Sequence, residues 1–162
     1  NSHSYTIHTM KYALFLLIAI ACIAGVVADK NTVEGQAYLE KNAKAEGVTV
    51  LPSGLQYKVL THGNGNAKPT RSDVVRVHYR GTSIEGKEFD SSYRRGQPAT
   101  FGVTQVIAGW TEILQHMTIG DIYEVTIPSN LAYGTRGAGG LIGPNAVLIF
   151  KIELLGIEGK DL

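Results

Sequence analysis

The stretch DVVRVHYR, residues 73–80, decides the structural class of this chain, because its side chains alternate in character with a period of two. Val75, Val77 and Tyr79 form an apolar and aromatic row, while the positions between them are basic or polar. Such alternation is typical of a β-strand with one face buried and the other in solvent. We therefore expect partner strands for this segment elsewhere in the chain.

Several other short runs are rich in β-branched and aromatic residues and end at turn residues. Residues 110–117 have the spacing of a helix instead, with Trp110, Ile113 and Met117 on one face and Gly120 after the end. This combination predicts an α+β fold, in which an antiparallel β-sheet of about five strands wraps on one short α-helix. The expected strands are 55–60, 73–80, 99–103, 122–127 and 147–155, with an extended piece at 88–90 and a glycine-rich loop at 134–144.

The segment before the sheet, TVEGQAYLEKNAKAE at residues 32–46, is polar and rich in helix formers. Thr32 suits the N-cap position, Gly47 ends the run, and the apolar residues form only a weak stripe. We therefore predict an N-terminal surface helix within residues 29–47, followed by a single folded domain at 48–162.

Residues 1–28 differ in composition from everything that follows. Met10 and Lys11 precede an apolar run at 12–24, and small residues lead up to Ala28. This is the pattern of a secretory signal peptide, and the run is short for a membrane span. We predict a leader and signal peptide at residues 1–28, cleavage after Ala28 and no stable membrane anchor afterwards. An uncleaved anchor is the alternative.

Export places the protein outside the cell or at its surface. The ending GKDL, residues 159–162, partly matches a retention signal, so residence in the lumen of the endoplasmic reticulum is the alternative. The only cysteine, Cys22, lies in the predicted signal peptide, so we expect no thiol chemistry in the mature protein. The chain has 15 basic and 14 acidic side chains, and removal of Lys11 makes the two equal, which argues against nucleic-acid binding.

Two motif-like features do not support a cofactor or metal site. The segment GTSIEGK, residues 81–87, has the spacing of a phosphate-binding loop, but Glu88 stands where a Ser or Thr would hold magnesium. The segment also lies between predicted strands instead of between a strand and a helix. His62, His78 and His116 lack metal-ligand spacing, so no metal and no cofactor are predicted.

Large apolar and aromatic residues are concentrated at strand ends and in loops, where solubility alone favours polar side chains. IAGW at residues 107–110 and LAYG at residues 131–134 each place an aromatic residue beside glycine in a connection, which favours a functional role over packing. For Phe101 and Phe150, core packing is an equally good interpretation. The full set is Tyr79, Phe89, Phe101, Val106, Ile107, Trp110, Tyr133 and Phe150.

Five motifs in one order resemble the FK506-binding (FKBP) family of peptidyl-prolyl cis–trans isomerases. They are VHYRG at 77–81, GKEFDSSYRRGQP at 86–98, VIAGW at 106–110, LAYG at 131–134 and the pair Pro144-Asn145. NAKAEGV at 42–48 and LPSGLQYKVL at 51–60 resemble the macrophage infectivity potentiator (Mip) branch in particular. The resemblance covers about residues 47–157.

The resemblance implies an apolar pocket that seats the proline of an X–Pro peptide and that macrolides such as tacrolimus and rapamycin also occupy. It implies catalytic positions at Tyr79, Asp90, Trp110 and Tyr133, with Trp110 as the pocket floor. The implied substrate- and inhibitor-binding positions are Phe89, Arg95, Phe101, Val106, Ile107, Leu141, Ile142 and Phe150. Three positions depart from the family pattern, namely Ala99, Ala138 and Gly143, the last of which replaces a frequent proline.

Several questions stay open at this point. Asp90 either acts on the substrate or pairs with Arg95 or Tyr79 to hold the pocket wall, since a carboxylate at an apolar rim usually acquires a partner. The protein is either an isomerase or a proline-binding chaperone or host-interaction module whose turnover is incidental. Dimeric Mip-type proteins carry a long N-terminal helix, whereas residues 32–46 give only about four turns, so we expect a monomer.

Overall fold

The computed structural model describes residues 29–160 of the chain. The predicted leader, signal peptide and cleavage site fall on residues 1–28 and lie outside the described residues. Within the described part, no helix has the length and apolar character that crossing a membrane requires.

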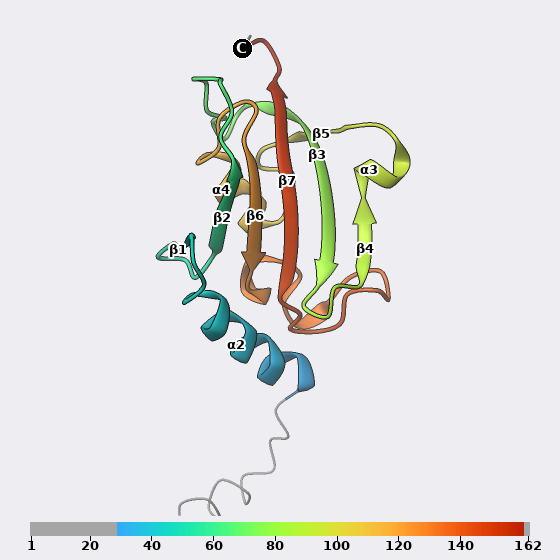
Figure 1. Cartoon of the computed structure of the whole chain (residues 1–162). Helices are drawn as coiled ribbons and strands as arrows, with labels where there is room; N and C mark the ends of the chain where they lie inside the picture. The colour runs from blue at the N-terminus through green and yellow to red at the C-terminus, as the bar shows by residue number, and fades with distance from the viewer. Residues whose placement is uncertain (1–28, 161–162) are drawn as a thin grey trace, which may run out of the picture.

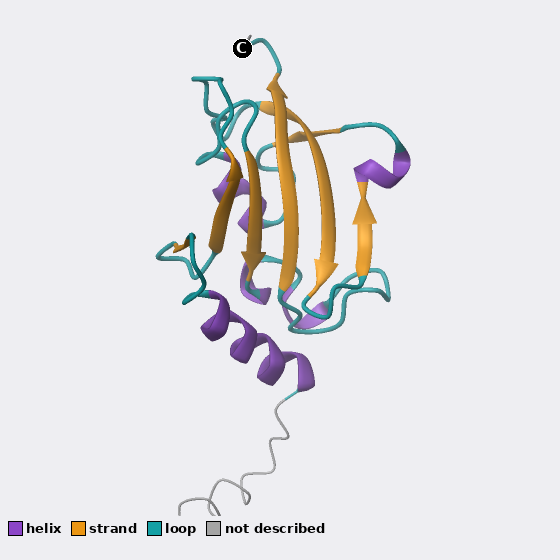
Figure 2. Cartoon of the chain, in the orientation of Figure 1, coloured by secondary structure: helices purple, strands orange, loops and turns teal. Residues whose placement is uncertain are grey.

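Seven antiparallel strands form one sheet, with α4 packed against one of its faces (Figures 1 and 2). The strand order is β1-β2-β6-β7-β3-β4, and β5 pairs with β3 beside β4. The strands are β1 (Val48–Val50), β2 (Gln56–Thr61), β3 (Val74–Ser83), β4 (Glu88–Ser91), β5 (Ala99–Gly102), β6 (Ile122–Ile127) and β7 (Leu148–Ile157). The helices are α2 (Lys30–Asn42), α3 (Ser92–Arg95) and α4 (Ala108–Leu114), with short 3-10 turns η1 (Ser129–Leu131) and η2 (Gly134–Arg136).

The strand that the sequence singled out, β3, is the backbone of this arrangement. Val75, Val77 and Tyr79 are buried on one face, as the alternation predicts, and β7 pairs with β3 along most of its length. The same face buries Trp110, Ile113 and Leu114 of α4 in the core. The predicted α+β class, with an antiparallel sheet wrapped on one short helix, is confirmed.

The sheet has two strands more than the expected five: β1, which the sequence did not indicate, and β4, which it indicated only as an extended piece at 88–90. β1 has three residues and β4 has four, too few for an alternating pattern to stand out. β4 and β5 both pair with β3, β5 over Val74–Val77 and β4 over Arg80–Thr82, and α3 lies between them in the chain. The edge of the sheet next to β3 is therefore formed by two short strands instead of one long strand.

Both predicted helices are shifted. α2 runs over Lys30–Asn42 instead of 32–46, because Asp29 occupies the N-cap position and turns follow the C-cap at Ala43. α4 runs over Ala108–Leu114 instead of 110–117, since the Ile107 carbonyl already accepts hydrogen bonds from the amides of Trp110 and Thr111. Trp110 consequently belongs to the first turn of its helix.

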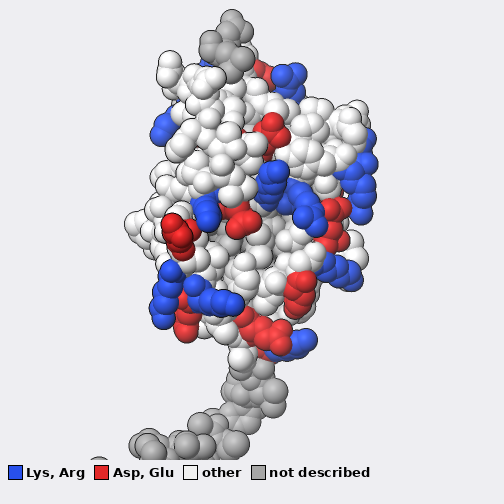
Figure 3. Space-filling model, viewed as in Figure 1, with Lys and Arg blue, Asp and Glu red and all other residues white. Residues whose placement is uncertain are grey.

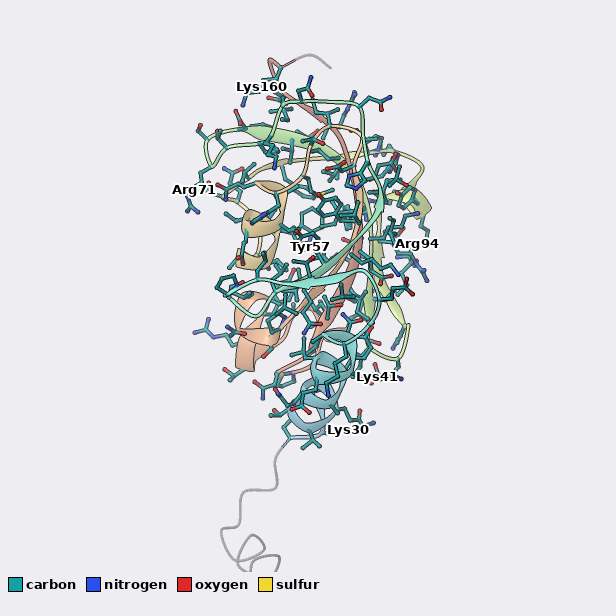
Figure 4. The ribbon with its side chains drawn as sticks, turned by 60° about the vertical axis from the view of Figure 1, so that its left-hand side comes forward. Lys30, Lys41, Tyr57, Arg71, Arg94 and Lys160 are labelled. Atoms are coloured by element: carbon teal, nitrogen blue, oxygen red, sulfur yellow. The ribbon has the colours of Figure 1, made fainter. Side chains whose placement is uncertain are left out.

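α2 lies across one end of the sheet and is fixed there by polar contacts (Figure 1). The Asn42 side chain donates to the Gln56 Oε1 atom at 2.9 Å, and Gln56 Nε2 donates to the Leu39 carbonyl at 2.9 Å. Gln56 is itself buried. In Figure 4, Lys30 and Lys41 mark the two ends of this helix, and Lys160 lies at the opposite end of the molecule.

Charged side chains of both signs are interspersed on the face shown in Figure 3. Glu88 of the edge strand β4 pairs with Arg80 of β3 at 2.8 Å and with Arg94 of α3 at 3.4 Å. The face therefore has no extended single-sign patch of the kind that binds a polyanion.

Candidate functional site

A cavity of about 650 Å³ opens between α4, β3, the β4 wall and the loops that follow β6. Every site residue expected from the sequence except Arg95 lines it. The lining comprises Tyr79, Phe89, Asp90, Phe101, Gln105, Val106, Ile107, Trp110, Tyr133, Ala138, Gly139, Leu141, Ile142 and Phe150. Residues that are far apart in the sequence thus meet around one apolar space.

Trp110 lies at the centre of the aromatic group. Its indole meets the rings of Tyr79, Phe101 and Phe150 at centroid distances of 5.2, 5.7 and 5.4 Å and interplanar angles of 88°, 86° and 87°. Such edge-to-face contacts place the positive edge of one ring on the negative face of another. Three rings therefore stand as walls around the indole, and Trp110 is only 4% exposed.

Two glycines make this packing possible. A Cβ atom at Gly109 would lie 2.5 Å from the Cγ2 atom of Ile127, so the glycine lets the first turn of α4 close onto β6. A Cβ atom at Gly81 would lie 2.6 Å from the Phe89 ring and 2.8 Å from the Phe150 ring. These two rings meet edge to face at 5.6 Å in the space that Gly81 leaves. The motifs VHYRG and VIAGW thus contain the glycines that the pocket geometry requires.

Asp90 is held by three donors at the edge of the cavity. Its Oδ2 atom accepts a short hydrogen bond from the Tyr79 hydroxyl, and Oδ1 accepts from the Arg95 guanidinium and, at 2.8 Å, from the Ser91 amide. Arg95 closes the ring by donating to the Tyr79 hydroxyl at 2.9 Å. Arg95 therefore lies behind the cavity wall. Asp90 contacts both Arg95 and Tyr79, the two partners expected if its role is to hold the wall.

The protonation states of this group follow from its contacts. Burial works against ionisation of Asp90, but the hydrogen bonds from Tyr79 and Arg95 outweigh it and lower the pKa of the carboxyl group. Burial and the bond to Asp90 raise the pKa of the Tyr79 hydroxyl. At neutral pH the wall thus contains a carboxylate, a neutral phenol and a guanidinium.

The rim of the cavity is more exposed than its floor. Tyr133 is 41% exposed and Leu141 is 62% exposed. Residues 138–142 form a tight hairpin in which the Ala138 amide donates to the Ile142 carbonyl at 2.8 Å, and Gly139 and Gly140 have φ of 57° and 69°. Glycines adopt such positive φ values without steric cost.

The structure places four positions that were not among the expected lining residues. Gln105 lines the cavity although nothing in its residue type predicts this. Its side chain folds over Gly102, where a Cβ atom would lie 2.7 Å from Gln105 Oε1, and its place directly before VIAGW was the only available cue. Ala138 and Gly139 contribute small surfaces at the rim. Ala99 instead pairs with Val77 in the sheet and does not line the cavity.

The phosphate-loop-like segment 81–87 is a strand end and a hairpin turn. The Ser83 amide donates to the Lys87 carbonyl at 2.9 Å, and Gly86 has φ of 84°. The segment therefore lies between two strands, as the sequence indicated, and does not open a helix.

Comparison with known proteins gives two family matches. Residues 65–155 match the model of the FKBP-type peptidyl-prolyl cis-trans isomerase, and residues 24–59 match the domain amino terminal to FKBP-type peptidyl-prolyl isomerase. The outer membrane protein MIP of Legionella longbeachae is 53% identical over 131 residues, which are 81% of this chain and 56% of that protein. The FKBP-type 22 kDa peptidyl-prolyl cis-trans isomerase of Escherichia coli K12 is 55% identical over 124 residues, 76% of this chain and 60% of that protein.

Two solved structures share the fold. The crystal structure of FkpA from Escherichia coli has a TM-score of 0.77 and 40% identity, covering 93% of this chain and 71% of that one. A peptidyl-prolyl cis-trans isomerase from Pseudomonas syringae pv. tomato has a TM-score of 0.74 and 37% identity, covering 82% and 98%. This chain spans only about half to three fifths of the length of the curated relatives that it matches. The motifs, the fold and these matches agree, and the chain belongs to the FKBP-type peptidyl-prolyl cis-trans isomerase family, with Mip and FkpA proteins among its relatives.

Proposed function

We propose that this protein catalyses cis–trans isomerisation of X–Pro peptide bonds in the 650 Å³ cavity. One observation carries the proposal: three rings stand nearly perpendicular to the Trp110 indole and leave its face as the floor of an apolar box. A pyrrolidine ring is compact, apolar and small enough to lie on such a floor. The pocket thus suits proline better than a longer or charged side chain.

The chemistry needs no nucleophile, because no covalent bond breaks. Rotation about a peptide bond meets a barrier of about 18–20 kcal/mol, which comes from amide resonance. The planar amide is more polar than the twisted one, so removing water from around it penalises the ground state relative to the transition state. The aromatic side chains of Trp110, Tyr79, Phe101 and Phe150 together form an environment from which water is largely excluded.

Two donors at the cavity are placed to hold the substrate chain. Among the described residues, none accepts a hydrogen bond from the Ile107 amide or the Tyr133 hydroxyl, and both residues line the cavity. We infer that they donate to carbonyl groups on either side of the X–Pro bond. Fixing the flanking chain while the bond twists would direct binding energy into the rotation.

The test is an isomerisation assay on a short peptide with a single X–Pro bond. We expect the purified protein to accelerate exchange, and we expect Tyr133→Phe to lower kcat/KM by about 3- to 10-fold, the range for one lost hydrogen bond. Because Tyr133 is 41% exposed and the substitution removes only the hydroxyl group, the variant should unfold at nearly the same denaturant concentration as the wild type. A wild-type protein without any rate enhancement would refute the enzyme proposal.

The same assay separates catalysis from simple binding. A proline-binding chaperone or host-interaction module would bind the peptide, as seen by tryptophan fluorescence of Trp110, without a matching rate. We propose that tacrolimus and rapamycin occupy the cavity and inhibit turnover, since its rim offers Leu141, Ile142 and Phe89 to a large apolar ligand. Inhibition that leaves Trp110 fluorescence unchanged would place the macrolide elsewhere.

We also propose export through the secretory pathway, on the strength of residues 10–28 in the sequence. The name of the Legionella longbeachae relative places that protein in an outer membrane. N-terminal sequencing of the mature protein checks the proposal for this chain. A mature chain that starts at residue 29 supports cleavage, and a retained segment 12–28 supports an anchor instead.

A further inference from the structure

The first turn of α2 contacts the loop that forms the cavity rim. Asn31 Nδ2 donates to the Pro144 carbonyl at 2.7 Å, across 113 positions of sequence. The neighbouring Asn145 amide donates to the Gly134 carbonyl at 2.8 Å, directly beside Tyr133. A chain of hydrogen bonds therefore connects the N-terminal helix with two parts of the rim.

Asn31 is also close to rim residues in space. A small side cavity of about 160 Å³ is lined by Asn31 together with Phe89, Leu141 and Ile142, three residues that also line the main cavity. The 138–142 hairpin is anchored by its own internal hydrogen bonds but is largely exposed at its tip. Its position over the cavity therefore depends on what holds residues 143–145.

Gly143 supplies the space for this contact. A Cβ atom at position 143 would lie 2.7 Å from Asn31 Nδ2, and the only other atom within 4 Å is Cγ of the same side chain. The φ of Gly143 lies outside the left-handed range, so its backbone would accept other residues. Within residues 29–160, the Asn31 side chain is thus the group that a Cβ atom at position 143 would meet, and the two residues form a matched pair.

We infer that Asn31 is a positioning residue of the site: it holds residues 138–145 over the cavity and so sets substrate affinity, and Gly143 leaves the space for its side chain. The inference rests on the proposed isomerase function for its kinetic consequence. It makes α2 a part of the binding site, although no α2 residue lines the main cavity. It also explains why glycine can replace the frequent proline at position 143. The hydrogen bond from Asn31 restrains the loop in place of the backbone stiffness that a proline would supply.

Asn31→Asp is the decisive variant, because it keeps the shape of the side chain and removes the donor. An acidic residue in the first turn favours the helix, so a loss of helix stability would not explain the result. We expect KM for the X–Pro peptide to rise about 2- to 5-fold with kcat within 2-fold of wild type, since the rim contacts ground state and transition state alike. Gln36→Ala, which removes a 3.0 Å bond to Glu40 on the same helix, is the matched control and should change neither constant.

The pair is tested by a double-mutant cycle. Gly143→Ala should raise KM in the wild type, where the new methyl meets Asn31, and should have little effect in an Asn31→Ala background. Equal effects in both backgrounds would overturn the matched pair.

Amide hydrogen exchange tests the role of Asn31 without relying on enzyme activity. The Ala138 and Ile142 amides, both bonded within the hairpin, should exchange about 2- to 10-fold faster in Asn31→Asp than in wild type. Unchanged exchange together with an unchanged KM would refute the positioning role. An inactive wild type with faster exchange in the variant would refute the enzyme proposal alone.

Discussion

Asp90 and Arg95 show how a polar group can exist at the edge of an apolar pocket. Each carboxylate oxygen has a donor, and the guanidinium lies 5.5 Å from the centroid of the Tyr79 ring, where cation–π attraction adds to the ion pair. The Tyr79 ring is fixed from both ends, by Trp110 on one side and by this pair on the other. The pair therefore orients a wall of the cavity.

A double-mutant cycle of Asp90→Ala and Arg95→Ala measures this coupling. The side chains are 41% and 44% exposed, so we expect a small but measurable coupling between them in urea unfolding. The coupling should decrease in high salt, which screens exposed charges. Strictly additive losses would show that the two side chains act independently.

At the scale of elements, Asp121 connects the turn after α4 with the loop after β2. Its Oδ1 atom accepts from the Gly63 amide at 2.7 Å, and Oδ2 accepts from the Thr118 amide at 2.7 Å. The residue is 3% exposed. Burial opposes its ionisation, but these amide bonds prevail and lower the pKa of the carboxyl group.

Asp121→Asn should therefore destabilise the protein in a pH-dependent way. Near neutral pH we expect the free energy of unfolding to decrease by about 1–3 kcal/mol. The NH2 group of asparagine would face one of the two backbone amides and, being a donor itself, could not accept that amide's hydrogen bond. Because the pKa of Asp121 is lower in the folded than in the unfolded state, its ionised carboxylate stabilises the fold fully at pH values above the unfolded-state pKa of about 3.9. This stabilisation is lost as the pH falls through the folded-state pKa. Chemical unfolding at pH 7 and at about pH 2.5 checks this: the gap between variant and wild type should narrow in acid, and a constant gap would contradict the assignment.

The docking of α2 depends on a glycine in the middle of the helix. A Cβ atom at Gly35 would lie 2.8 Å from the Cγ2 atom of Val147, which is buried and β-branched. Alanine is a better helix former than glycine by about 1 kcal/mol, yet overpacking costs about 1–3 kcal/mol. We therefore expect the steric clash to outweigh the gain in helix propensity.

We expect Gly35→Ala to lower the free energy of unfolding by about 1 kcal/mol and to become stabilising in a Val147→Ala background, where the clashing methyl is absent. Urea unfolding of the four proteins in this cycle measures both effects. A stabilising Gly35→Ala in the wild-type background would mean that α2 packs less closely than the structure has it.

At the scale of the whole molecule, the sequence predicts what is local and misses what is distant. The alternation of Val75, Val77 and Tyr79 indicates the central strand, and the family motifs bring the cavity lining together almost completely. Contacts such as Asn31 with Pro144 leave no local signature, because they join positions far apart in the chain. Arg95 is expected from the sequence both among the binding positions and as a partner of Asp90; it pairs with Asp90 but does not line the cavity.

We expect residues 29–162 to be monomeric. The 13-residue α2 is attached to its own domain, and Val33 is the only large hydrophobic residue of that helix that is strongly exposed. A single side chain is far less than the roughly 800 Å² per partner of a stable interface. Light scattering after gel filtration at micromolar concentration checks this, and a dimer mass would contradict it.

The short outer strands of the sheet limit how far an extended polypeptide could pair with it. β1 has three residues, and the opposite edge is divided between β4 and β5 with four residues each. A long open edge would act as a template on which an extended polypeptide could anneal and seed aggregates. Over residues 29–160 this sheet offers only brief stretches of such an edge, so under the proposed function an X–Pro substrate could enter and leave the cavity without pairing along the sheet.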